Sequence, residues 1–152
     1  MAGTTMEDTV RQELQEAYAE AGQAFKAKDA AAVMQKVAPG FTQRMPDGTV
    51  IDAVEAEAAM REWFATADTV TRYAVQIDAL TVQGDNAVAE VTEDVAMTFA
   101  DPVGQAHERV QANTSEVTWV RTADGWRIRR SEYRTAKMTV DGKPVTPLSM
   151  PA

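Results

Sequence analysis

A β-hairpin is predicted by the stretch Val117-Thr118-Trp119-Val120-Arg121-Thr122-Ala123-Asp124-Gly125-Trp126-Arg127-Ile128. Two runs rich in β-branched and aromatic residues flank Asp124-Gly125, a pair that favours a tight turn between antiparallel strands. Each arm carries one tryptophan, Trp119 or Trp126. The hairpin matters because it determines which side chains of its two strands share a face of the sheet.

The register of this hairpin follows from the length of its turn. The predicted cross-strand pairs are Arg121 with Trp126, Trp119 with Ile128, Val117 with Arg130, and Ser115 with Glu132. Opposed residues share a face, so Arg130 and Glu132 are expected beside the two tryptophans. A guanidinium and a carboxylate on an apolar face predict a ligand pocket, and a slip of one residue would move both groups to the other face.

Length and composition indicate one globular domain. The chain has 152 residues, of which 45% are hydrophobic and 25% are charged. We expect the domain over residues 1–138 and an irregular, proline-containing tail over 139–152. The net charge of −8 argues against nucleic acid or an anionic membrane as a partner. No apolar run approaches the ~20 residues of a membrane span, and without a signal-like N-terminus the expected location is the cytoplasm.

The residue types also limit the chemistry. Cysteine is absent and His107 is the one histidine, which excludes disulfides, thiolate catalysis and a multi-histidine metal site within one chain. No glycine-rich loop follows a strand and opens a helix, and no metal-ligand spacing is present, so we expect no cofactor.

The first part of the chain predicts helices and short strands. Thr5 caps a helix whose apolar residues recur every three or four positions as far as Phe25. The elements expected next are a short helix over 30–36 capped by Asp29 and ended by Pro39-Gly40, strands over 41–45 and 49–51, and a third helix opened by the capping-box pair Asp52 and Glu55.

From about Thr71 the hydrophobic period changes to two, which is typical of half-buried strands. Four long strands are predicted, over residues 72–82, 87–99, 107–121 and 126–138. Short loops join them, so neighbours should be antiparallel in a meander. In the first strand the apolar positions switch from odd to even numbers near Asp78-Ala79, which predicts a β-bulge.

This order of elements, from about residue 7 to 135, resembles the nuclear transport factor 2-like fold. In this α+β cone a curved antiparallel sheet, expected here with four to six strands, wraps around three N-terminal helices. The resemblance is carried by Phe25-Lys26-Ala27-Lys28-Asp29, Pro46-Asp47-Gly48, Gly84-Asp85-Asn86-Ala87-Val88 and the hairpin at 119–128, whose sequence is similar to the SnoaL-like branch. It implies a pocket inside the cone, lined by the concave sheet face and the first helix, and a homodimer formed through the outer sheet face.

The candidate site lies on the concave face. Pairing Phe99 with His107 puts Glu93 opposite Asn113. The expected polar cluster is Glu93, Asn113, Ser115, Arg130 and Glu132, with His107 toward the other end of the pocket. Tyr18, Phe25, Trp63 and Trp119 are expected to line the cavity, with plain core packing as the alternative. His107 follows a loop, so it is either a base at the pocket mouth or an exposed strand-end residue. Arg127, Arg129, Tyr133 and Thr135 are expected on the outer face.

The cluster predicts acid–base chemistry. An apolar pocket removes water from a carboxylate and raises its pKa, which makes Glu93 or Glu132 usable as a general acid or base. Two adjacent carboxyl groups can divide into one protonated and one ionised group. Arg130 would hold a carboxylate ionised or bind an anionic ligand oxygen. The alternative is a satisfied ionic network that only stabilises the sheet.

Glu132-Tyr133 also stands where limonene-epoxide-hydrolase-like members of this fold place an aspartate followed by a tyrosine, after a turn glycine that is Gly125 here. Those enzymes need an Asp–Arg–Asp arrangement, with a tyrosine and an asparagine that hold the water. Thr42 and Arg44 stand at the positions of the tyrosine and the asparagine, so the resemblance to that chemistry is only partial.

Three functions follow. The favoured one is a domain that binds a small apolar molecule with polar groups. The second is a cofactor-independent acid–base enzyme (a cyclase, isomerase, dehydratase or hydrolase) that uses Glu93, Glu132 and Arg130. The third is a protein-interaction domain, because the fold hosts all three classes.

Overall fold

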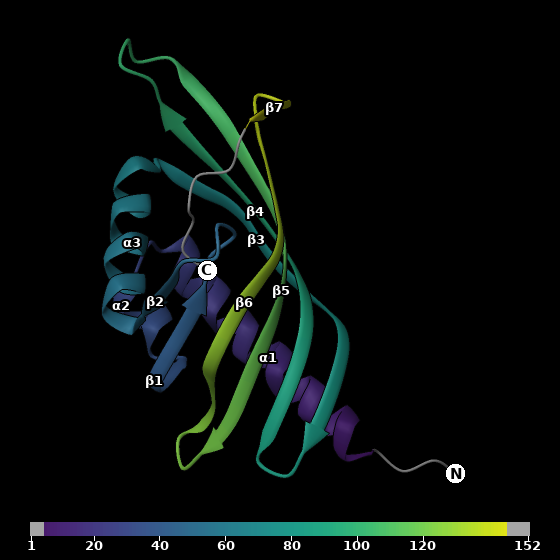
Figure 1. Ribbon diagram of the computed structural model, residues 1–152. Coiled ribbons are helices and arrows are strands. Elements are labelled where there is room, and N and C mark those ends of the chain that lie inside the picture. The colour runs from purple at the N-terminus through teal and green to yellow at the C-terminus, as the bar shows by residue number, and fades with distance from the viewer. Residues whose placement is uncertain (1–4, 146–152) are drawn as a thin grey trace.

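The computed structural model describes residues 5–145, which form three helices and a seven-stranded mixed sheet (Figure 1). The helices are α1 (Met6–Lys26), α2 (Ala30–Met34) and α3 (Ala53–Thr66). The strands are β1 (Val37–Arg44), β2 (Val50–Asp52), β3 (Thr69–Gln83), β4 (Asn86–Ala100), β5 (Ala106–Thr122), β6 (Gly125–Val140) and β7 (Lys143–Val145). The α+β cone with three N-terminal helices and four long strands is confirmed.

The strand order is β2-β1-β6-β5-β4-β3, and β7 pairs with β6. All pairs are antiparallel except that of β1 with β6, which is parallel, so the sheet is mixed rather than purely antiparallel. The short helix also ends earlier than expected, at Met34. Pro39 and Gly40 lie inside β1, where the pairing with β6 shifts between Val37 and Thr42. Such an irregularity tolerates a residue without a backbone N–H.

The predicted helix starts are confirmed. The hydroxyl of Thr5 accepts a hydrogen bond from the Asp8 amide at 3.0 Å, and Asp29 caps α2. Asp52 and Glu55 form the capping box of α3, each side chain accepting from the other residue's backbone N–H. These contacts satisfy amide groups that have no partner within the helix, and so set where each helix begins.

The predicted bulge in β3 is confirmed as a register shift between Ile77 and Ala79. In the late hairpin, Arg121 pairs with Trp126 and Trp119 with Ile128, as expected. Beyond that point the predicted register is wrong, because Arg129 has no opposite residue and forms a bulge. As a result Thr118, not Val117, pairs with Arg130. The bulge moves the residues that follow it to the other face, as far as the next irregularity in the strand pair.

The bulge exchanges two sets of side chains. Val117 pairs with Ser131, and Ser115 pairs with Tyr133. Ser131 and Tyr133 of β6 therefore face the concave side. The expected outer position of Tyr133 is therefore wrong; this residue is 7% exposed. A second shift, between Ser115 and Thr114, restores the original alternation.

Helix α1 crosses the concave side of the sheet, and α2 and α3 lie toward one side of it (Figure 1). Two groups of buried apolar residues result. One joins Val10 and Leu14 of α1 to Trp119 and Trp126, and the other surrounds Phe25 and includes residues of α3. No helix within residues 5–145 is both long and apolar enough to cross a membrane.

Strand β6 runs to Val140, two residues past the expected end of the domain, and Asp141-Gly142 turns the chain into β7. Both turn residues have positive φ, 51° and 81°. The rest of the expected tail, residues 146–152, lies outside the described residues.

Candidate functional site

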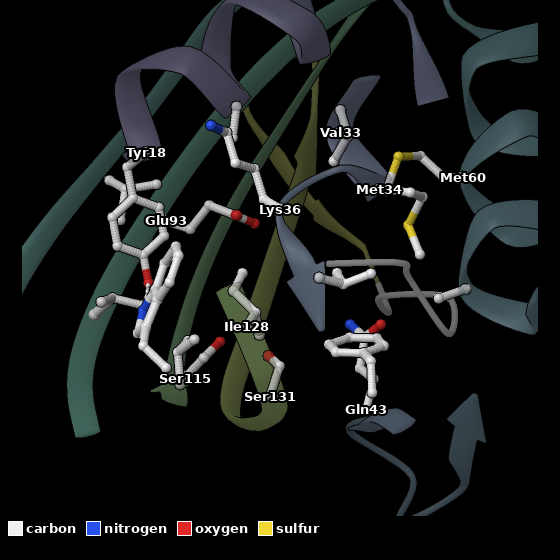
Figure 2. Close-up of a pocket in the computed structure, with 18 of the residues that line it drawn as sticks. Tyr18, Val33, Met34, Lys36, Gln43, Met60, Glu93, Ser115, Ile128 and Ser131 are labelled. Carbon is white, nitrogen blue, oxygen red and sulfur yellow. Dashed lines mark hydrogen bonds between the residues drawn. The ribbon is translucent and has the colours of Figure 1, made fainter. Parts of the chain in front are cut away.

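A cavity of about 70 Å³ lies between the concave sheet face and the helices (Figure 2). Most of its lining is apolar and includes Val33, Met34, Phe41, Met60, Val91, Val117 and Ile128. The polar residues that line it are Tyr18, Lys36, Gln43, Tyr73, Glu93, Ser115, Ser131 and Tyr133. Lys36 is paired with Glu20 of α1, so its charge is already partnered. Within residues 5–145, Glu93 is the one carboxylate that lines this cavity.

Glu93 lies on β4 opposite Asn113, as predicted. One carboxylate oxygen, Oε2, accepts a hydrogen bond from the Tyr73 hydroxyl at 2.9 Å, and Oε1 accepts one from the Asn113 amide at 3.3 Å. Burial raises the pKa of Glu93, and these two hydrogen bonds only partly oppose the rise. Glu93 is therefore a fixed carboxyl group, more easily protonated than an exposed glutamate, that faces an apolar cavity.

Tyr73 is held in place from two sides. Its ring packs on Phe25, with ring centroids 4.7 Å apart, and on the bare Cα of Gly22. A Cβ at Gly22 would stand 3.0 Å from the Tyr73 ring. Burial, and then the charge of Glu93, raise the pKa of Tyr73 well above its ordinary value. The phenol thus stays protonated and serves as a hydrogen-bond donor.

Tyr18 of α1 and Trp119 of β5 form a second polar contact in the cavity. The Trp119 indole Nε1 donates to the Tyr18 hydroxyl at 3.3 Å, and the rings meet edge to face with centroids 5.1 Å apart. The pKa of Tyr18 is raised, mainly by burial. Its oxygen accepts from the indole and its hydroxyl donates to no residue within 5–145, so its proton can point at a ligand. Tyr18, Trp119 and Ser115, which were predicted as ligand-binding residues, all line this cavity, and their role in binding stays a prediction.

Gln43, Ser131 and Tyr133 line the cavity but were not predicted to do so. Burial, followed by the charge of Glu93, raises the pKa of Tyr133, and its side-chain interaction with Gln43 partly opposes the rise. A signal for Ser131 and Tyr133 was present in the sequence. The large apolar residues of β6 stand at even positions at Trp126 and Ile128, but the next aromatic residue, Tyr133, stands at an odd position. A switch from even to odd positions predicts a bulge, as the switch from odd to even positions did in β3.

Arg130 and Glu132 do not share the cavity with Glu93, and their expected position on the concave face is wrong. Both lie on the outer face, where they form a network with Glu116 and Arg134. The Arg130–Glu132 ion pair measures 3.6 Å and the Arg134–Glu116 pair 2.7 Å. The Arg130 side chain is 56% exposed. The expected pair of carboxyl groups, Glu93 with Glu132, is therefore not formed.

The other predicted residues lie in varied places. Phe25 and Trp63 belong to the buried core beside the cavity and do not line it. Asn113 acts through its hydrogen bond to Glu93. His107 lies away from the cavity, at the start of β5, between Asp101 at 2.7 Å and Asp141 at 2.5 Å.

The described residues contain no group of three or more histidine, cysteine, aspartate or glutamate side chains arranged to hold a metal. The chemistry that this geometry offers is hydrogen bonding and proton transfer by one desolvated carboxyl group, within reach of protonated phenols. No arginine of the described part of the chain lines the cavity, and Lys36 is paired with Glu20, so an anionic ligand would meet the charge of Glu93 uncompensated.

Residues 15–133 match the family model described as a SnoaL-like domain. A comparison with curated proteins gave no significant match. Among solved structures, the Kfla4162 protein from Kribbella flavida superposes with a TM-score of 0.69 at 18% identity, covering 83% of this chain and 90% of that one.

Two further structures share the fold. A provisionally assigned dehydratase of the nuclear transport factor 2-like family from Streptomyces avermitilis has a TM-score of 0.65 at 17% identity, covering 93% of this chain and 100% of its own. A nuclear transport factor 2-like superfamily protein from Salmonella enterica has a TM-score of 0.62 at 19% identity, covering 83% and 90%. At these identities the similarity shows the fold alone.

Proposed function

Since this chain belongs to the SnoaL-like family of the nuclear transport factor 2-like superfamily, we propose that its cavity binds a small, uncharged and mainly apolar molecule. The observation that carries this proposal is the Glu93 carboxyl group, held by Tyr73 and Asn113 inside an apolar cavity. Sites for small molecules combine an apolar lining with a few placed polar groups.

The charge balance of the cavity supports an uncharged ligand. Glu93 has a raised pKa and no cationic partner among the described residues. A ligand hydroxyl or carbonyl can hydrogen-bond to the carboxyl group in either protonation state, whereas a ligand anion would be repelled by the ionised form.

The size of the cavity limits what it holds without rearrangement. About 70 Å³ is well below the ~300–1,000 Å³ of drug-sized sites. Met34 and Met60 form part of the wall (Figure 2), and methionine side chains repack at low cost. The cavity therefore suits a small ring or a head group, with room gained by movement of the methionines.

A second candidate function is acid–base catalysis by Glu93 alone. Burial raises its pKa above the ordinary value, and a carboxyl group with a raised pKa is better suited to give and take a proton. The phenol of Tyr73 steadies the carboxylate at 2.9 Å, and the free proton of Tyr18 can polarise a ligand oxygen. The fold-level similarity to a provisionally assigned dehydratase is compatible with this function but is an analogy.

The test is a screen of neutral, mainly apolar fragments by two-dimensional NMR on wild type, Glu93→Gln and Glu132→Gln. The second variant is a matched control, because it makes the same change on the outer face. We expect wild type and Glu132→Gln to bind the same fragments, and Glu93→Gln to bind those with a polar group about tenfold more weakly. Absence of binding to wild type, or equal losses in both variants, would reject the proposal and favour an interaction domain.

The same variants separate binding from catalysis. Fragments that bind are incubated with wild type and analysed by mass spectrometry for chemical change. Turnover that Glu93→Gln abolishes, with binding retained in part, would assign an enzyme. Binding without turnover across the hit classes would leave the ligand-binding function alone.

A further inference from the structure

Gln43 is a buried polar residue whose amide lacks well-formed hydrogen bonds. Its side chain is 0% exposed, and neither its amide oxygen nor its amide nitrogen has a partner at hydrogen-bonding distance and angle among the residues that the structure describes. The Tyr133 side chain is a polar group near this amide, which lowers the pKa of that phenol. Burying one such atom unpaired is costly, and native proteins rarely bury both atoms of an amide in this way. The unpaired amide therefore requires an explanation.

The position of Gln43 points to the cavity. It lies on β1, where it pairs in the parallel register with Ser131 of β6. Both residues line the cavity, and Figure 2 shows the Gln43 side chain pointing into it from β1. Gln43 and Glu93 lie on strands separated by β6 and β5, so they approach the enclosed space from different strands.

We propose that Gln43 recognises a ligand group that carries a hydrogen-bond donor beside an acceptor on one edge, as a lactam or a primary carboxamide does. The Gln43 oxygen would accept from the ligand N–H, and the Gln43 nitrogen would donate to the ligand carbonyl. This inference rests on the proposed ligand-binding function and narrows it to one chemical class.

The alternatives satisfy the amide less well. A ketone or an ether offers acceptors only, so it leaves the Gln43 oxygen unpaired. A protonated amine offers donors only and leaves the Gln43 nitrogen unpaired. The edge of a lactam satisfies both atoms at once, and a site built to hydrogen-bond a group discriminates strongly against analogues that lack it.

The test uses three ring probes of similar size: δ-valerolactam, N-methyl-δ-valerolactam and cyclohexanone. The two probes other than the lactam keep the carbonyl but lack the N–H. Dissociation constants are measured by NMR titration on the full chain for wild type, Gln43→Met and Gln76→Met. Gln43→Met keeps the length and unbranched shape of the side chain. Gln76→Met makes the same change at an exposed position of β3.

We expect wild type and Gln76→Met to bind the lactam about tenfold or more tightly than its N-methyl analogue. Gln43→Met should lose this preference and still bind cyclohexanone, weakened at most by loss of the one hydrogen bond that the Gln43 nitrogen would donate to the ketone. Retained binding of that kind would show that the cavity is intact. Thermal unfolding of each variant verifies that it is folded.

Two outcomes would overturn the inference in distinguishable ways. If the probes bind but Gln43→Met leaves the preference unchanged, or wild type has none, Gln43 is satisfied by water and only this inference fails. If wild type binds none of the probes and no fragment in the wider screen, the proposed function fails and this inference fails with it.

Discussion

The Tyr73 hydroxyl on β3 and the Glu93 carboxylate on β4 are joined by a hydrogen bond of 2.9 Å. The residue directly opposite Glu93 is Val75, so the bond runs diagonally across the two strands. Only a long side chain spans such a diagonal. This contact places a phenol proton on a carboxylate inside the cavity and makes Tyr73 the main residue that positions Glu93.

Replacing Tyr73 with phenylalanine should raise the pKa of Glu93 further. The phenol donates to the charged form of the carboxylate and so lowers its pKa, while burial remains after the substitution. The measurement is an NMR titration of the Glu93 side-chain carboxyl carbon. Tyr18→Phe is the control, because Tyr18 lines the same cavity and makes no hydrogen bond to Glu93. An equal pKa in wild type and Tyr73→Phe would contradict the role given to this hydrogen bond.

Gly22→Ala should destabilise the protein although alanine is the better helix former. The helix propensity of alanine contributes about 1 kcal/mol of stability. Against this, the new Cβ stands 3.0 Å from Cδ1 of the partly buried Tyr73 ring, and overpacking of this kind costs about 1–3 kcal/mol. We expect a net loss of about 1 kcal/mol in the free energy of unfolding, measured by urea denaturation. Gln23→Ala, at the exposed neighbouring position, should be close to neutral. A net gain in Gly22→Ala would show that the ring moves freely.

His107 should make the far end of the sheet pH-sensitive. Its Nδ1 meets Asp141 at 2.5 Å and its Nε2 meets Asp101 at 2.7 Å, and these hydrogen bonds raise the pKa of His107. Hydrogen bonds to His107 and to backbone amides lower the pKa of both aspartates. The stabilisation from the histidine is full below its unfolded pKa of about 6.5 and is lost as pH rises through the folded value. The stabilisation from the two aspartates is present above about pH 4. It is lost as the pH falls through the pKa values that these aspartates have in the folded protein.

The contact of His107 with Asp101 and Asp141, which joins the turns that carry these two aspartates, should therefore be strongest from about pH 4 to about pH 6.5. Hydrogen exchange of residues 101–107 and 141–143 in wild type and His107→Gln measures it. We expect the variant to exchange faster than wild type within that window, with the difference shrinking at higher pH. A difference that does not change with pH would mean that the ring packing of His107 on Phe99, not its charge, holds the turns.

Much of the architecture could be predicted because each element has a local signal. The caps at Thr5 and Asp52 and the pairing of Glu93 with Asn113 follow from short-range chemistry or from turn length. The predicted register was wrong only past Ile128, where one unpaired residue changes the face of Arg130 and Glu132. A bulge in a strand that alternates arginine with apolar residues leaves only a weak mark, so two of the five residues of the expected polar cluster were misplaced.

Gln43 could not be predicted for a different reason. Its role depends on the parallel pairing of β1 with β6, which brings together segments far apart in the sequence. Neither strand carries a local signal for that partner. The turn lengths that set the antiparallel register do not apply, because the connection from β1 to β6 runs through most of the fold.

The outer face of the sheet should form a homodimer interface, as expected from the pairing of relatives. Arg130 and Arg134 lie there among Glu116 and Glu132. In a dimer with a two-fold axis, the arginines of one copy can face the glutamates of the other copy across this surface. Native mass spectrometry of wild type should show a dimer. Glu132→Lys places a third cation beside the two arginines and should weaken the dimer at least about tenfold, since unpaired like charges at an interface cost several kcal/mol.

Asp124→Lys makes the same charge change in the β5–β6 turn, away from this network, and should leave the dimer intact. A monomeric wild type at micromolar concentration would contradict the interface outright. Equal weakening by both variants would show that net charge, and not the outer-face network, governs association. Because surface ion pairs contribute little on their own, only a dimer that responds to Glu132→Lys and not to Asp124→Lys supports an interface across this face.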